Sequence, residues 1–394
     1  MRENKYIPIL IFAIAGVWLR WYLIHTPGYV NDINSFLAWG NQIKDHGFWS
    51  LYSKSYSQFL DYPPLIPLIT SWWMRINIFS ALTTPQFFKV LPTMAEIALL
   101  IITALFVIRS KVEYKSTLLA VIFLQPGMAL VTSSWGQVDA ILVLVLILGF
   151  VVMEANLFVA TFLMFLGLLI KPQAILGLLV FGIFIFAKHG FIKFLKQLGF
   201  LVVLVAAVAL IFKFHNGNFF SIYLLSTSRY QYLSVNAFNI WWLMNGSKSF
   251  GLSDVAAKPI GMALFAAFLI PGVYYLIKKA SKLPQVFLVL SYVYLIFFVF
   301  PTEIHERYLY PAVVFAAIAA ILSKRIFGVY LILSATLFLN CYAVLQTIFP
   351  QFQSVIPISG NLLAGNWTII VAAANVLVAI YLSLYLTNEV FKRS

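Results

Sequence analysis

The sequence predicts an all-α protein that crosses a membrane many times, as a single integral membrane domain over residues 1–394. Two facts of composition support this fold class: 62% of the 394 residues are hydrophobic and only 10% are charged. In addition, apolar runs close to the roughly 20 residues that a helix needs to cross a bilayer recur along the whole chain. A water-soluble globular fold is therefore excluded.

These apolar runs predict about twelve transmembrane helices. The fifth and sixth runs are short, so residues 157–187 form either two spans or one hairpin broken around Lys171-Pro172-Gln173. The predicted spans lie near residues 6–24, 87–108, 116–132, 138–153, 157–170, 172–187, 197–213, 259–277, 284–300, 308–322, 326–347 and 367–386.

The formal net charge of +14 is explained by orientation in the membrane. Fifteen of the 26 basic residues fall on one side of the predicted topology, in short connections, whereas most acidic residues fall on the other side. The positive-inside rule then predicts cytoplasmic termini in the cell membrane. No basic run or RNA-binding signature is present, so membrane lipid is the expected partner and nucleic acid is not. The inner residues are Arg2, Lys5, Arg109, Lys111, Lys115, Lys188, Lys193, Lys196, Lys278, Lys279, Lys282, Lys324, Arg325, Lys392 and Arg393.

The first outer connection, residues 25–88, is predicted to form surface-lying helices, because it is too long and too patterned for a passive link. Apolar residues recur at helical spacing between residues 33 and 44, and a second helix is predicted from Pro63 to about Phe79. The second outer loop, residues 214–258, is rich in aromatic residues and asparagine, which suits a sugar or a lipid headgroup. The residues on the apolar face of the first helix are Ile33, Phe36, Leu37, Gly40 and Ile43.

Carboxylates on the outer face are candidates for chemistry, because charged residues are scarce in this chain. Asp32 is the first choice, and its structural alternative is the N-cap of the helix that follows. Asp61 alternatively supports the proline-led helix start, and Asp139 alternatively caps a span. Glu306 and Arg307 stand at a span entrance, where a structural ion pair is the alternative.

Two residues inside predicted spans are expected to be structural. Glu96 lies within the second span, where a lone carboxylate is costly, so it is expected to pair with Arg20 or Lys89. The single cysteine, Cys341, is expected in the core. No His/Cys cluster has metal-ligand spacing, so no metal site is predicted.

Several stretches, in chain order, resemble the multi-spanning GT-C glycosyltransferases that use lipid-linked sugars. Among these the chain looks most like the PIG-V-related prokaryotic mannosyltransferases, and the resemblance covers residues 10–311. The stretches are Asp32 to Phe36, Asp61-Tyr62-Pro63-Pro64-Leu65, Trp135-Gly136-Gln137-Val138-Asp139-Ala140, Lys171-Pro172-Gln173, Asn236 to Trp241 and His305-Glu306-Arg307-Tyr308-Leu309-Tyr310-Pro311.

The resemblance implies an inverting transferase that moves a hexose, here mannose, from a polyprenyl-phosphate donor to a hydroxyl of a glycolipid, wall polymer or protein at the outer membrane face. Asp32 is implied as the general base, with Asp61 beside it. Many GT-C members carry two adjacent acidic residues where this chain has Asn31-Asp32, which argues against a divalent metal, so no cofactor is expected. The implied donor-binding residues are Tyr62, Gln137, Asp139, Lys171, Arg229, Asn239, His305, Glu306 and Arg307.

The leaving group gives an independent chemical argument. A departing phosphate monoester needs no proton donor, so one general base is enough, whereas glycoside hydrolysis requires two carboxylates. The phosphate needs cations, and His305, Arg307, Lys171 and Arg229 are the candidates on the outer face.

Two alternatives to a transferase of this kind remain. A lipid-linked saccharide flippase or transporter would show internal repeats or mid-membrane ionisable residues. An outer-face polysaccharide ligase or polymerase would consume a pyrophosphate-linked donor.

Overall fold

The computed structural model describes residues 7–52, 60–76, 80–226, 230–348 and 360–392. Within these residues the chain is helical, and its only β contacts are isolated bridges. The predicted all-α class is therefore confirmed. Six helices are long and apolar enough to cross a membrane, and shorter apolar helices accompany them, so the protein is a polytopic membrane protein.

Each of the twelve apolar runs found in the sequence overlaps a helix. The long spanning candidates are α5 (Thr84–Arg109), α11 (Phe191–Phe214), α14 (Ala257–Lys278), α17 (Lys324–Ile348), α18 (Trp367–Phe391) and the continuous run of α6 (Lys115–Leu124), α7 (Pro126–Ala129) and η1 (Leu130–Ser134). The shorter apolar helices are α1 (Ile7–Ile24), α8 (Asp139–Val152), α9 (Leu157–Ile170), α10 (Ala174–His189), α15 (Leu283–Val299) and α16 (Tyr310–Ala319).

The two long loops contain the remaining helices. In the first loop, α2 confirms the predicted helix, because Ile33, Phe36, Gly40 and Ile43 are buried on one face, whereas Leu37 is only partly buried. That face packs against other helices: Phe36 stacks on Phe88 of α5, with ring centroids 5.2 Å apart. The loop helices are α2 (Val30–His46), α3 (Phe48–Leu51), α4 (Leu65–Ile76), α12 (Phe219–Ser226), α13 (Ile240–Asn245), η2 (Gly246–Ser249), η3 (Glu306–Leu309), η4 (Ala320–Leu322) and η6 (Leu362–Ala364).

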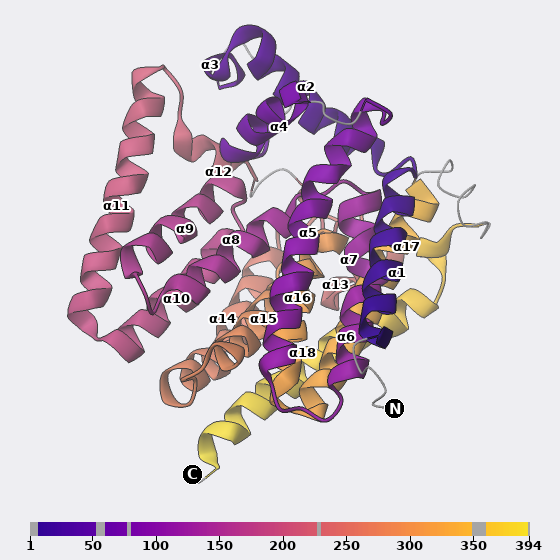
Figure 1. Cartoon of the computed structure of the whole chain (residues 1–394), viewed down its shortest axis with the longest axis vertical. Helices are drawn as coiled ribbons and strands as arrows, with labels where there is room; N and C mark the ends of the chain where they lie inside the picture. The colour runs from indigo at the N-terminus through magenta and orange to yellow at the C-terminus, as the bar shows by residue number, and fades with distance from the viewer. Residues whose placement is uncertain (1–6, 53–59, 77–79, 227–229, 349–359, 393–394) are drawn as a thin grey trace.

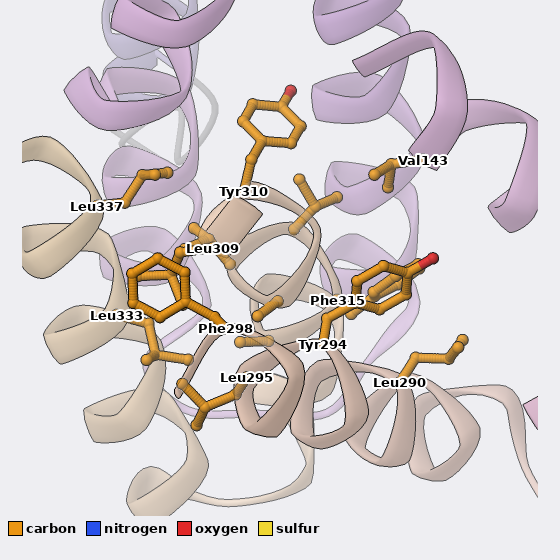
Figure 2. Packing of buried hydrophobic residues seen from close by; sticks show 14 of the residues in the cluster. Val143, Leu290, Tyr294, Leu295, Phe298, Leu309, Tyr310, Phe315, Leu333 and Leu337 are labelled. Atoms are coloured by element: carbon orange, nitrogen blue, oxygen red, sulfur yellow. The ribbon is translucent and has the colours of Figure 1, made fainter. Parts of the chain in front are cut away.

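The core is built around α15 and α16. Every residue of α16 is buried, and α8 and α17 pack around the pair (Figure 2). In contrast, only 6% of the apolar window of α11 is buried. Its mean hydropathy of 2.4 is nearly the same as the 2.3 of α5, whose window is 50% buried. A helix that is apolar on all sides and unburied within the protein requires lipid around it. The side chains labelled in the core are Val143, Leu290, Tyr294, Leu295, Phe298, Leu309, Tyr310, Phe315, Leu333 and Leu337.

The two ends of the helical body differ. The first-loop helices α2, α3 and α4 lie at one end, whereas the start of α1, the end of α18 and the α14–α15 turn lie at the other (Figure 1). Basic turns meet at this second end: Lys324 Nζ lies 3.5 Å from Glu113 Oε2, and Lys279 Nζ donates to the carbonyl oxygen of Lys392 at 3.0 Å. Connections that the sequence assigns to one side are thus neighbours in space.

Two structural expectations inside the predicted spans are confirmed. Glu96 of α5 pairs with Arg20 of α1 at 2.6 Å, and both side chains are buried. Cys341 is also buried, as a free cysteine of α17. The predicted break between residues 157 and 187 is present as well, because α9 ends at Ile170 and α10 begins at Ala174.

Candidate functional site

A polar cavity of about 420 Å³ lies where α2 meets the segments around residues 61, 137, 171, 235 and 305. These segments are distant in the sequence, so the cavity is a product of the tertiary fold. Eight of the predicted site residues line it together. They are Asp32, Asp61, Tyr62, Gln137, Lys171, His305, Glu306 and Arg307.

Asp32 is held by donors from another part of the chain. Its Oδ2 accepts a 2.9 Å hydrogen bond from the Trp135 indole Nε1 and a second hydrogen bond from the Gln137 side-chain amide. The Arg307 Nη2 atom lies 3.9 Å from the same oxygen. The other oxygen, Oδ1, accepts no hydrogen bond from any described residue, so it is available to a ligand in the cavity.

The alternative that Asp32 is an N-cap is wrong. Helix α2 begins at Val30, its N-cap is Tyr29, and no side-chain cap hydrogen bond is present. Asp32 therefore lies inside the first turn, where a negative charge still interacts favourably with the helix dipole. Its oxygen is oriented by tertiary contacts rather than by capping.

Arg307 brings a cation to the same cavity wall. Its Nη1 donates to Glu306 Oε1 at 3.0 Å, and its buried Nε has no hydrogen-bond partner. The guanidinium also lies over the rings of Trp135 and Tyr308, 5.8 Å and 5.7 Å from the centroids. Burial lowers the pKa of Arg307, but the nearby carboxylates of Asp32 and Glu306 outweigh it and raise the pKa well above its usual range. The arginine is therefore a permanent cation at the cavity wall.

Two residues that precede Arg307, namely Glu306 at the start of η3 and His305 just before it, have shifted pKa values. Burial raises the pKa of Glu306 from its ordinary 4.5 to about 7, although the charge of Arg307 opposes this shift. Burial, together with the positive charges of Arg307 and Lys171, holds the pKa of His305 well below its ordinary range. His305 is therefore a neutral hydrogen-bonding group at neutral pH, which differs from the cation that the sequence predicted.

Lys171 stands at the break between α9 and α10. Pro172 lacks a backbone donor and disfavours helix at the residue before it, so Lys171 is extended there. Its Nζ donates to both carboxylate oxygens of Asp139, each at 2.9 Å. The ammonium also faces the rings of Tyr62 and Tyr308, at 5.4 Å and 5.8 Å. Asp139 thus supports the site by fixing Lys171, without lining the cavity itself.

Two residues in another wall of the cavity have unusual backbone angles. Asn236 and Glu303 have φ angles of 61° and 63°, which non-glycine residues rarely adopt. The two segments that contain them are joined by bridges from Val235 and Asn236 to His305. Both strained residues line the cavity. Strain of this kind costs on the order of 1–3 kcal/mol and clusters at functional sites.

One predicted residue lies away from the cavity, and another is not among the described residues. Asn239 does not line the cavity; its Oδ1 instead caps α13 by accepting from the backbone nitrogens of Trp241 and Trp242. Arg229 lies outside the described residues. Within the described part of the chain, no three His, Cys, Asp or Glu side chains are close enough to hold a metal ion, and the predicted independence from metal remains a prediction.

Several site residues escaped the sequence analysis. Trp135 lies within a stretch that was singled out, but only the fold shows that its indole reaches Asp32. Tyr29 stacks on the Trp135 ring with centroids 4.7 Å apart. Lys258 and Glu303 form a 2.6 Å ion pair at the cavity, and no local sequence signal links them.

An apolar groove of about 530 Å³ adjoins the polar cavity. It runs between α9, α10, α11, α14 and α15, and its polar side chains Thr161 and Gln197 bond to each other at 2.8 Å. Four residues line both spaces, which are therefore neighbours. They are Ile175, Leu176, Met262 and Phe297.

No protein-family model and no curated protein matches this chain. The chemistry of the site is therefore argued from its geometry. A carboxylate with one open oxygen can accept a proton from a hydroxyl, while a neighbouring guanidinium can bind an anion. The adjoining groove can hold a hydrocarbon chain, because apolar surface is buried there at a favourable free energy.

Proposed function

We propose that this protein is an inverting glycosyltransferase of the GT-C type, which moves a hexose from a polyprenyl-phosphate donor to an acceptor hydroxyl at the outer membrane face. One observation carries the proposal: Asp32 and Arg307 share a cavity that adjoins an apolar groove. Mannose as the sugar, and a glycolipid, wall polymer or protein as the acceptor, follow from the family resemblance described above.

The proposed step is a single displacement at the anomeric carbon. Asp32 Oδ1 accepts the proton of the acceptor hydroxyl as its oxygen forms the new bond to the anomeric carbon. The bond between that carbon and the phosphate oxygen breaks, and its electron pair leaves with polyprenyl phosphate. Attack opposite the phosphate inverts the configuration. Arg307 is proposed to bind the phosphate through its guanidinium at the cavity wall, with Lys171 as a second cation.

The charge balance supports a monophosphate rather than a pyrophosphate donor. Each described cation of the cavity already has a carboxylate partner: Lys171 has Asp139, Lys258 has Glu303, and Arg307 has both Asp32 and Glu306. Little uncompensated positive charge remains for a multiply charged pyrophosphate. A phosphodiester with one negative charge fits this balance better.

A donor comparison tests the function. Purified protein is offered polyprenyl-monophosphate mannose, the matching glucose compound and a polyprenyl-pyrophosphate sugar, each with a lipid acceptor. We expect transfer from a monophosphate donor with inverted product configuration. Transfer from pyrophosphate donors alone would instead indicate a polysaccharide ligase or polymerase. Movement of intact lipid-linked sugar across vesicles without transfer would indicate a flippase.

The same proposal includes the topology: twelve spans, cytoplasmic termini and a cavity at the outer face of the membrane. The grouping of basic turns at the end opposite α2 and α4 supports this orientation. Cysteine at position 247, from Ser247→Cys in η2, should react with an impermeant reagent added outside cells, whereas Lys111→Cys should not. The parent chain is the control, since its Cys341 is buried. Labelling at position 111 would refute the orientation.

A further inference from the structure

A buried polar cluster lies behind the cavity, between α1, α5 and the π-helical segment η1. Three consecutive hydroxyl residues of η1 each bond to a different partner, one on the segment after α1 and two on α5. All these side chains are buried. The pairs are Thr132 with the Glu96 carboxylate, Ser133 Oγ with Thr93 Oγ1 at 3.0 Å, and Ser134 Oγ with Thr26 Oγ1 at 2.8 Å.

Two buried basic side chains complete the cluster. Arg20 holds the other oxygen of Glu96 at 2.6 Å, which satisfies that carboxylate from both sides. Lys89 Nζ donates to the backbone oxygen of Thr26 at 2.6 Å, just beyond the end of α1. Thr26 is thus bound by Lys89 through its carbonyl and by Ser134 through its hydroxyl.

The segment η1 leads directly to the groups that hold Asp32. The backbone bond from Trp135 N to Leu130 O, 2.8 Å long, continues the π-helical register. Gly136 then turns the chain with a φ of +85°, and a Cβ there would lie 3.2 Å from Lys89 Cγ. The indole of Trp135 and the amide of Gln137 therefore reach Asp32 from a turn whose place is fixed by the cluster.

We infer that Thr132, Ser134 and Lys89 are positioning residues, which fix η1 and the segment after α1 so that Asp32 keeps its open oxygen towards the cavity. Single-turn π-helical segments are frequent at functional sites. This inference rests on the proposed role of Asp32 as the base. The bond between Trp135 and Asp32, however, can be observed without any assay of transfer.

Thr132→Val removes one hydroxyl of the cluster and nearly preserves the side-chain shape. We expect kcat to fall on the order of 10²-fold, since a shift of ~1 Å can cost that much, while donor KM changes less than about threefold. Thr132→Ser, which restores the hydroxyl, should recover most of kcat. The matched control is Thr336→Val, because this buried threonine of α17 bonds only to the Leu333 carbonyl of its own helix.

The second readout is the indole Nε1–H resonance of Trp135 in tryptophan-labelled protein, assigned by its loss in Trp135→Phe. Asp32→Asn should shift this resonance, and Thr132→Val and Ser134→Ala should shift it in the same direction. Should Thr132→Val not purify in folded form, Ser134→Ala carries the same expectations for kcat and for the resonance.

Three results would overturn the inference: parental kcat in both folded variants, an unmoved resonance in both, or an equal loss of kcat in Thr336→Val. A different result would overturn the proposed function alone. If Asp32→Asn transfers sugar at the parental rate while the resonance still shifts in Thr132→Val, the cluster positions Asp32 but Asp32 is not the base.

Discussion

Two arginine–carboxylate contacts in this protein have the same chemistry and opposite surroundings. Arg20 and Glu96 are 2.6 Å apart, almost fully buried, and Glu96 also accepts from Thr132. Arg307 and Asp32 are 3.9 Å apart at a cavity, and the Asp32 side chain is 26% exposed. The first contact is closed to any ligand. The second leaves Asp32 Oδ1 without a hydrogen bond from the described residues and places the Arg307 guanidinium at the cavity wall.

The comparison shows that the ion pair itself does not identify a functional site. A buried ion pair costs desolvation energy, which is offset when every polar atom has a hydrogen-bond partner. Removal of one partner leaves a buried charge uncompensated and should therefore reduce the free energy of unfolding. A loose pair at a cavity contributes little to stability, so its loss should reduce activity. The predictions below use this difference, beginning with the largest effect.

The largest expected effect is on stability, in Glu96→Ala. Because the variant leaves the buried Arg20 guanidinium uncompensated, we expect the free energy of unfolding to fall by about 3–5 kcal/mol. Chemical unfolding in detergent measures it. Asp32→Asn is the comparison variant, because its amide oxygen can still accept from Trp135 and Gln137, and its loss should stay below about 1 kcal/mol. Equal losses in the two variants would show that the two contacts do not differ as argued.

Asp32→Asn should have the opposite effect to Glu96→Ala, with a large loss of activity and little loss of stability. The amide oxygen can still accept from Trp135 and Gln137, but the proton acceptor is lost, so transfer should slow by at least ~100-fold. Folding and binding of the lipid-phosphate sugar should be normal. Asp61→Asn should slow transfer less than Asp32→Asn does. Transfer by Asp32→Asn within a few-fold of the parent would move the search for the base to Asp61 or Asp139.

Glu306, the tight partner of Arg307, gives a pH test. Its pKa is raised to about 7 by burial, so the folded protein binds this proton more tightly than the unfolded chain does. Stability from this group is therefore present at low pH and lost as pH rises from about 4.5 to about 7. Relative to Glu306→Gln, the unfolding free energy of the parent should fall by roughly 1–3 kcal/mol across this window. A constant difference between the two proteins would contradict the shift.

The smallest effect is expected for Arg307→Lys. Charge is retained but the planar donor group is lost, so we expect a roughly tenfold loss of transfer with normal folding, the loss of about one charge-assisted hydrogen bond. Arg109→Lys, at the end of α5, is the control and should leave transfer unchanged. An unaltered donor affinity in Arg307→Ala would remove this residue from the donor site.

Local patterns predicted a large part of this molecule. Apolar runs located the helices, and helical spacing selected the buried face of α2, because both depend on residues close together in the chain. The scarcity of charge pointed to Asp32, Asp61, Glu306 and Arg307, which the fold gathers in one cavity. Tyr62 and Gln137, which also line it, were implied only by the family resemblance. The cost of a carboxylate within a span likewise predicted that Glu96 pairs with Arg20 or Lys89, and the fold selects Arg20.

Other properties depended on the tertiary structure alone. Helices α5 and α11 have nearly equal hydropathy, yet one is half buried and the other almost bare, because hydropathy does not distinguish a protein core from lipid. The sequence pattern allowed Asp32 to be an N-cap, but the donor that orients its oxygen comes from Trp135, 103 positions away. It also offered His305 as a cation, whereas burial beside Arg307 and Lys171 makes it neutral. Long-range contacts set both properties, and they exist only once the helices have packed.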